Sequence, residues 1–141
     1  MEGLSEYGHA LVAMAGVSVV ALLLSPLSAM RKTAAGLAPG AEPEADYDNK
    51  TYRFHRCYAN LTESIGVFAA VTVAAILAGA APFWVNTFAS IFLAVRILLV
   101  FVHINGIGKP DMGLRSFSYV AGWLMCIGLA VLAIGAALSG G

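Results

Sequence analysis

The chain has 141 residues, of which 60% are apolar and only 11% are charged, and its formal net charge is zero. Soluble domains carry about 25% charged residues, so this composition excludes an ordinary soluble domain and indicates an integral membrane protein. Because neither charge is in excess, nothing in the composition favours binding to nucleic acid. A membrane-crossing helix needs about 20 apolar residues, so we predict an all-α four-helix membrane bundle, a single domain over residues 1–141.

The first apolar run covers residues 8–30 and is followed at once by Arg31 and Lys32. A cleaved signal peptide is the competing interpretation, but its leading segment should be positive, and this one holds two glutamates and no Lys or Arg. We therefore expect a retained membrane helix that bends or ends near Pro26. The next segment, residues 33–48, is rich in Gly, Pro and acidic side chains, which is typical of an exposed loop.

Further apolar runs predict the remaining helices, over about residues 50–79, 83–105 and 114–138. The first of these is free of charge only from Ser64 onward, so its first turns should stand in or above the headgroup layer. The sequence GIGKPDMG, residues 106–113, separates the last two helices. Several glycines recur along the last helix, and small residues in lipid-embedded helices mark close helix–helix contacts.

The basic residues predict the orientation in the membrane. Most Lys and Arg residues flank the first and third loops, and none lies in the second loop or in either terminal segment. The positive-inside rule therefore places the first and third loops in the cytoplasm and both termini on the opposite side. Short loops without a subcellular address signal favour a bacterial inner membrane.

Four polar side chains recur near the start of the second helix at intervals of 3, 4 and 3 residues: Arg53, Arg56, Asn60 and Glu63. At 100° per residue they fall within a sector of about 80°. They could serve only to join helices, or they could form one wall of a polar pocket.

Arg96 lies inside an apolar run of the third helix. An Arg at the centre of a membrane helix costs about 2.5–3.5 kcal/mol even on lenient insertion scales, so it should face the protein interior or a wet cavity. We predict a contact between Arg96 and Glu63, within one chain or across a subunit boundary. His103 lies two turns further on the same helix face, and Arg115 opens the fourth helix. With Arg31 at the end of the first helix, these groups predict a polar pocket at the cytoplasmic headgroup level.

Cys57 and Cys126 are expected at different depths, so a disulfide between them is not predicted. Neither cysteine has a partner at a spacing that would indicate a zinc or redox site, so no metal site is predicted.

The combination of these residues resembles the MAPEG family, the membrane-associated proteins in eicosanoid and glutathione metabolism. The family pattern of Arg, Asn and Glu at the start of helix two is matched by Arg56, Asn60 and Glu63. A helix-three Arg after a small residue corresponds to Arg96, and an Arg that opens helix four in an LRS-like context corresponds to Arg115. The resemblance covers the whole chain in the number and lengths of the helices.

The resemblance implies a homotrimer that uses glutathione as co-substrate. In glutathione-using members the helix-two residues and the helix-three Arg hold the tripeptide, which implies binding roles for Arg56, Asn60, Glu63 and Arg96. A basic residue at the end of helix one contributes as well, here Arg31 or Lys32. The helix-four Arg stabilises the glutathione thiolate, which implies that role for Arg115.

The chain departs from the family pattern at Ser64 and His103, which stand where several glutathione-using members have Tyr. His103 could still donate a hydrogen bond in place of a phenol, so we include it among the binding residues.

The function implied by the resemblance is a glutathione-dependent transferase or peroxidase. A lipophilic electrophile or hydroperoxide would enter from the surrounding lipid, between neighbouring subunits. Two alternatives stay open. One is a non-catalytic scaffold of the same fold that binds a lipid headgroup or another anion. The other is a small transporter with Arg96 and Glu63 in its substrate path.

Overall fold

The computed structural model describes residues 2–107 and 113–140, apart from the side chain of Leu114. A short 3-10 helix, η1 (Glu2–Tyr7), leads into α1 (Gly8–Ala34). The chain continues with α2 (Lys50–Leu77), α3 (Pro82–Ile104) and α4 (Leu114–Ser139). Each α-helix is long and apolar enough to cross a membrane, and the described residues contain no strand. The predicted all-α architecture of four membrane helices is therefore confirmed.

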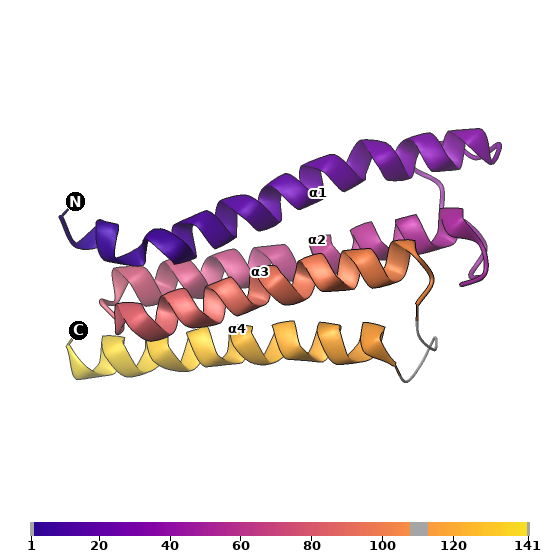
Figure 1. The fold of residues 1–141 in the computed structure, drawn as a ribbon. Helices are drawn as coiled ribbons and strands as arrows, with labels where there is room; N and C mark the ends of the chain where they lie inside the picture. Colours follow the sequence, from indigo (N-terminus) through magenta and orange to yellow (C-terminus); the bar gives the residue numbers. More distant parts are fainter. Residues whose placement is uncertain (1, 108–112, 141) are drawn as a thin grey trace.

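The helices run alternately up and down, so that both termini lie at one end of the bundle (Figure 1). α2 and α3 pack against each other and each contacts both α1 and α4, while α3 and α4 form the most extensive helix pair. We call the other end, where α1 and α3 finish and α2 and α4 begin, the loop end. It collects most of the basic side chains of the chain.

Local sequence explains most helix ends. The Asn49 side chain accepts a hydrogen bond from the Thr51 amide at 2.9 Å, which caps α2. The turn between α2 and α3 needs a left-handed residue, supplied by Gly79 at φ 72°, and Pro82 then opens α3. Pro26 does not end α1, which continues to Ala34, so a helix end at this proline is wrong. Neighbouring helices in a membrane bundle stabilise a helix across a proline.

The centre of the bundle is filled by aromatic rings and small side chains. Phe68 of α2 and Phe92 of α3 are fully buried and stacked nearly parallel, with ring centroids 3.9 Å apart. α1 and α3 are in contact, and each carries fully buried alanines, among them Ala13 and Ala89, of the small size that permits close packing of membrane helices. Gly128 of α4 lies against the ring of Phe88 on α3. A Cβ at this position would be only 2.9 Å from the ring, so the contact needs a glycine.

Gly128→Ala should lower the thermal stability of the protein in detergent. The new methyl group would overlap the ring of Phe88, and overpacking of this kind costs about 1–3 kcal/mol. Gly135→Ala is the matched control, because its Cβ would enter open space on the same helix. A lower apparent Tm for Gly128→Ala than for Gly135→Ala is expected. Equal values would show that α3 and α4 do not pack this closely.

Candidate functional site

A polar pocket of about 400 Å³ lies at the loop end of the bundle. Three helices and the loop before α2 contribute to its wall, so residues far apart in the sequence meet here. Its lining consists of Tyr47, Arg56, Asn60, Glu63, His103, Arg115, Ser116, Tyr119 and Val120. Five of the seven residues proposed from the sequence are therefore brought together around one space.

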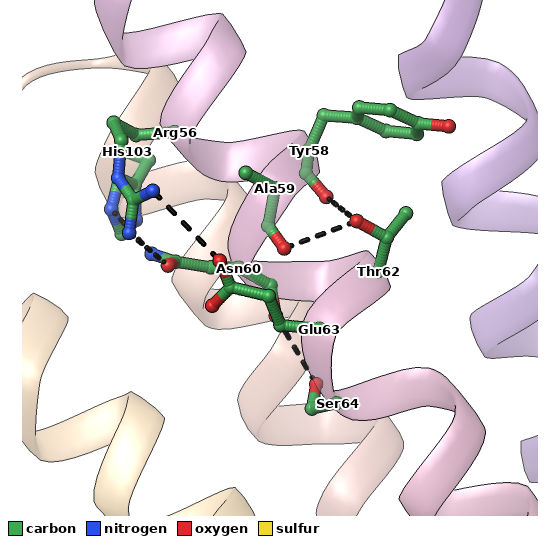
Figure 2. A network of polar contacts seen from close by, with 8 residues as sticks. All are labelled: Arg56, Tyr58, Ala59, Asn60, Thr62, Glu63, Ser64 and His103. Carbon is green, nitrogen blue, oxygen red and sulfur yellow. Dashed lines mark hydrogen bonds and ion pairs between the residues drawn. The ribbon is translucent and has the colours of Figure 1, made fainter.

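A chain of hydrogen bonds joins α2 to α3 along one wall of the pocket (Figure 2). Arg56 donates from Nη2 to the Asn60 side-chain oxygen at 2.7 Å. The Asn60 amide nitrogen lies 3.4 Å from His103 Nε2, and His103 Nδ1 lies 3.1 Å from the Leu99 carbonyl. A carbonyl can only accept, so Nδ1 carries the proton and Nε2 accepts from Asn60. Each member thereby fixes the orientation of the next.

Glu63 stands at the open edge of the pocket. Its carboxylate is 4.0 Å from Arg56 Nη1, and its side chain is 56% exposed on the chain (Figure 2). Thr62 and Ser64, beside it, turn their hydroxyls back to donate to carbonyls of α2. Ser64 therefore does not line the pocket, and its hydroxyl donates within its own helix.

Arg115 is 95% buried in the pocket wall, and its guanidinium lies 4.2 Å from the centroid of the Tyr47 ring. Tyr47 comes from the loop, and two contacts with α2 hold it. Its carbonyl accepts from Arg53 Nη1 at 2.7 Å, and its ring meets that of Tyr52 edge-on. The loop thus covers one side of the Arg115 guanidinium, and both Arg115 and Tyr47 line the pocket.

Arg96 is buried but does not line this pocket. Its guanidinium packs between the rings of Phe92 and Tyr119, 4.8 and 5.1 Å from their centroids. The predicted contact with Glu63 is not formed within the chain, where Glu63 faces Arg56 instead. The reason lies on α4: Gly122 has no side chain, and a Cβ there would be 2.8 Å from the Arg96 guanidinium carbon. Arg96 occupies that space rather than reaching α2.

Arg31 also lies outside the pocket, with its guanidinium 5.1 Å from the ring centroid of Phe54. The neighbouring Lys32 is buried and donates to the Pro39 carbonyl at 3.3 Å, which ties the loop to the end of α1. Within one chain, Lys32 supports the loop and Arg31 packs on α2, so neither basic residue at the end of α1 lines the pocket.

Four lining residues were not proposed from the sequence: Tyr47, Ser116, Tyr119 and Val120. Tyr119 follows Arg115 by one helical turn, so the two side chains share a helix face. That spacing could have been used to predict Tyr119 as a lining residue. Tyr47 carries no such signal, because a loop position has no periodicity.

The described residues, 2–107 and 113–140, contain no group of three or more His, Cys, Asp or Glu placed to hold a metal ion. Cys57 and Cys126 are both buried and are not joined in a disulfide. The chemistry available at the pocket is therefore that of two guanidinium groups, a carboxylate, an amide, an imidazole and hydroxyls.

The sequence matches the model of the MAPEG family over residues 9–135. That segment includes nearly all of α1 to α4 together with the whole pocket. Searches of curated proteins and of solved structures found no match. The family is one of four-helix membrane proteins connected with glutathione-dependent transfer and peroxide reduction, in agreement with the helices described above. The chain therefore belongs to the MAPEG family.

Proposed function

We propose that the pocket binds glutathione and that the protein is a glutathione-dependent transferase or peroxidase for lipophilic substrates. The observation that carries the proposal is that Arg56 and Arg115 meet one carboxylate of the described residues, that of Glu63, around one space. Glutathione has two carboxylates and one ammonium group, so the pocket complements its charges. Arg binds carboxylates through two parallel hydrogen bonds, which makes it well suited to this ligand.

The residues of the pocket divide the tasks of binding. Arg56 is oriented by Asn60 and is available to one glutathione carboxylate, and Glu63 to the ammonium group. Asn60 has a second N–H for the peptide backbone of the ligand. Arg115, which is buried in the pocket wall against the Tyr47 ring, faces the thiol. A thiol has a pKa near 8.5, and a guanidinium in a partly desolvated wall favours the thiolate.

The thiolate is the nucleophile in both reactions. In a transfer, its sulfur forms a bond to an electrophilic carbon, and the leaving group departs with the electron pair of the broken bond. In peroxide reduction, the sulfur attacks the terminal oxygen of the hydroperoxide and the O–O bond breaks. The departing alkoxide takes a proton from water and leaves as an alcohol. A second glutathione then reduces the sulfenic acid so formed, giving the disulfide and water. The thiol proton passes to solvent at the loop end.

We further propose that the protein is a homotrimer with the loop end in the cytoplasm. A carboxylate exposed on a membrane helix needs protein or water around it, and Glu63 is exposed on the outer face of α2. The same face carries small residues, Gly66, Ala70 and Ala74, all exposed in the single chain. Such residues permit close packing of a second copy. The basic residues of the loop end support the orientation, and a bacterial inner membrane remains our expectation for its location.

A non-catalytic protein that binds an anion or a lipid headgroup is the second candidate. The observation that favours it is that the polar atoms of Ser64 and His103 are engaged within the chain. Ser64 donates back to its own helix, and His103 Nε2 is occupied by Asn60. This candidate predicts ligand binding without turnover.

Arg115→Ala should abolish the thiolate absorbance that develops when glutathione is titrated into the purified protein. Loss of one group that stabilises developing charge costs about 100- to 1,000-fold in turnover, so activity should fall on that scale. Lys50→Ala is the matched control, because Lys50 carries an exposed positive charge at the same end but lies outside the pocket. Absence of both binding and thiolate signal in the unmodified protein would refute the proposal. Binding without turnover would favour the second candidate.

Asn60→Ala should weaken glutathione binding by about tenfold, the scale of one hydrogen bond to a charged group. The change removes the acceptor of Arg56 and the donor to His103 together. Asn60→Asp keeps the acceptor for Arg56, so it should separate the two contributions. Isothermal titration provides the affinities. If neither variant differs from the unmodified protein, Arg56 does not depend on this amide.

Purified in a mild detergent, the protein should have a mass, corrected for bound detergent, of three copies of the 14.6 kDa chain. Light scattering coupled to gel filtration measures it. A single-chain mass would contradict the trimer. It would also mean that no second copy covers the exposed side chain of Glu63.

A further inference from the structure

Tyr47 lies in a tight turn that directly precedes α2. The Asp46 carbonyl accepts a hydrogen bond from the Asn49 amide, and the Asp46 carboxylate accepts one from the Asp48 amide, both at 3.0 Å. Asp side chains stabilise turns by bonding the backbone two residues further on. Asn49 is also the residue that caps α2, so the turn is continuous with the helix. The backbone of Tyr47 is therefore held by its neighbours in the sequence.

Arg53, one turn into α2, ties this turn to the end of α3. It donates from Nη1 to the Tyr47 carbonyl at 2.7 Å. Its guanidinium also lies against Gly106, where a Cβ would be only 3.2 Å from Nε and from the guanidinium carbon. Gly106 has φ 66°, a conformation that favours glycine. Arg53 thus lies between the first loop and the turn after α3, and both contacts are made within one chain.

The start of α4 is an unfavourable place for a cation. Arg115 is the second residue of that helix, and the first turn of a helix carries partial positive charge. The face of an aromatic ring carries partial negative charge, and the Arg115 guanidinium lies 4.2 Å from the centroid of the Tyr47 ring. The ring thereby offsets the charge of the helix start and limits the directions in which the guanidinium can turn. Both side chains line the pocket.

We propose that Tyr47 is a positioning residue that holds the Arg115 guanidinium towards the sulfur of bound glutathione, and that Arg53 holds Tyr47 in place for this task. The inference deepens the proposed function and rests on it, because it takes glutathione as the ligand. A hydrogen-bond donor stabilises developing charge best when it is already aimed at that charge. Tyr47 acts through Arg115 and transfers no proton, so its ring is needed and its hydroxyl is not.

The role of the ring is tested by comparing Tyr47→Ala with Tyr47→Phe in the full-length protein in detergent. Tyr47→Ala should raise the pH at which bound glutathione is half thiolate by about one unit and lower kcat about tenfold, the scale of one partly buried cation–π contact. The Kd for glutathione should change by less than about threefold, because Arg56 and Glu63 still bind the charged ends of the ligand. Tyr47→Phe keeps the aromatic face and should match the unmodified protein within about twofold.

The role of Arg53 is tested in the same assay. Arg53→Ala should raise the thiolate pH in the same direction as Tyr47→Ala and by no more than that variant does, because the ring is still present but less firmly held. Lys50→Ala is the matched control, since Lys50 is an exposed cation one turn earlier on α2 and lies outside the pocket. If Arg53→Ala and Lys50→Ala behave alike, Arg53 does not hold Tyr47.

Two results overturn the role of Tyr47 and leave the proposed function intact. One is an unchanged thiolate pH in Tyr47→Ala. The other is an equal loss in Tyr47→Phe and Tyr47→Ala, which would assign the effect to the hydroxyl.

The contact between Tyr47 and Arg115 is also tested without glutathione, through the Tm of the empty protein. If the two side chains act together, the changes in Tm caused by Tyr47→Ala and Arg115→Ala should not add up in the double variant. Additive changes would overturn the inference whatever the ligand is. If the unmodified protein forms no glutathione thiolate, the proposed function fails, and this comparison alone decides whether Tyr47 positions Arg115.

Discussion

A charged side chain is stable inside a membrane only where protein or water surrounds it, and this constraint governs the arrangement of the loop end. The chain meets it in three ways. Arg56 hydrogen-bonds Asn60, Arg115 stacks on Tyr47, and Arg96 is enclosed by aromatic rings. Each of these contacts requires that the helix carrying the arginine turn that side chain towards the inside of the bundle. Together they leave a polar space of about 400 Å³ in an otherwise apolar bundle.

The hydrogen-bonded chain through Asn60 gives that space a defined shape before any ligand arrives. The amide oxygen faces Arg56 and the amide nitrogen faces His103, so a flipped amide would lose both bonds. Groups held in place in this way lose little conformational entropy on binding, which favours affinity. A histidine serves here because the Leu99 carbonyl selects the tautomer that can accept from Asn60.

The helices and most of the pocket could be predicted from sequence because both depend on periodicity. Apolar runs give the helices, and the 3–4 spacing of Arg56, Asn60 and Glu63 gives one wall. The orientation of Arg96 could not be predicted in this way, since spacing specifies a face and not the partner on the next helix. The partner depends on a missing side chain at Gly122. Tyr47 could not be predicted either, because its position in a loop depends on contacts with other segments and not on periodicity. These contacts are with Arg53 and Tyr52 of α2.

The stack of Phe68 on Phe92 has a consequence for the membrane in which the protein sits. Both rings are fully buried, and their planes are nearly parallel at the centre of the chain. Below the polar space, the two rings fill the centre of the chain and leave little room for water between α2 and α3. If the pocket admits a charged compound at the loop end, as we propose, these stacked rings stand between that compound and the opposite side of the bundle.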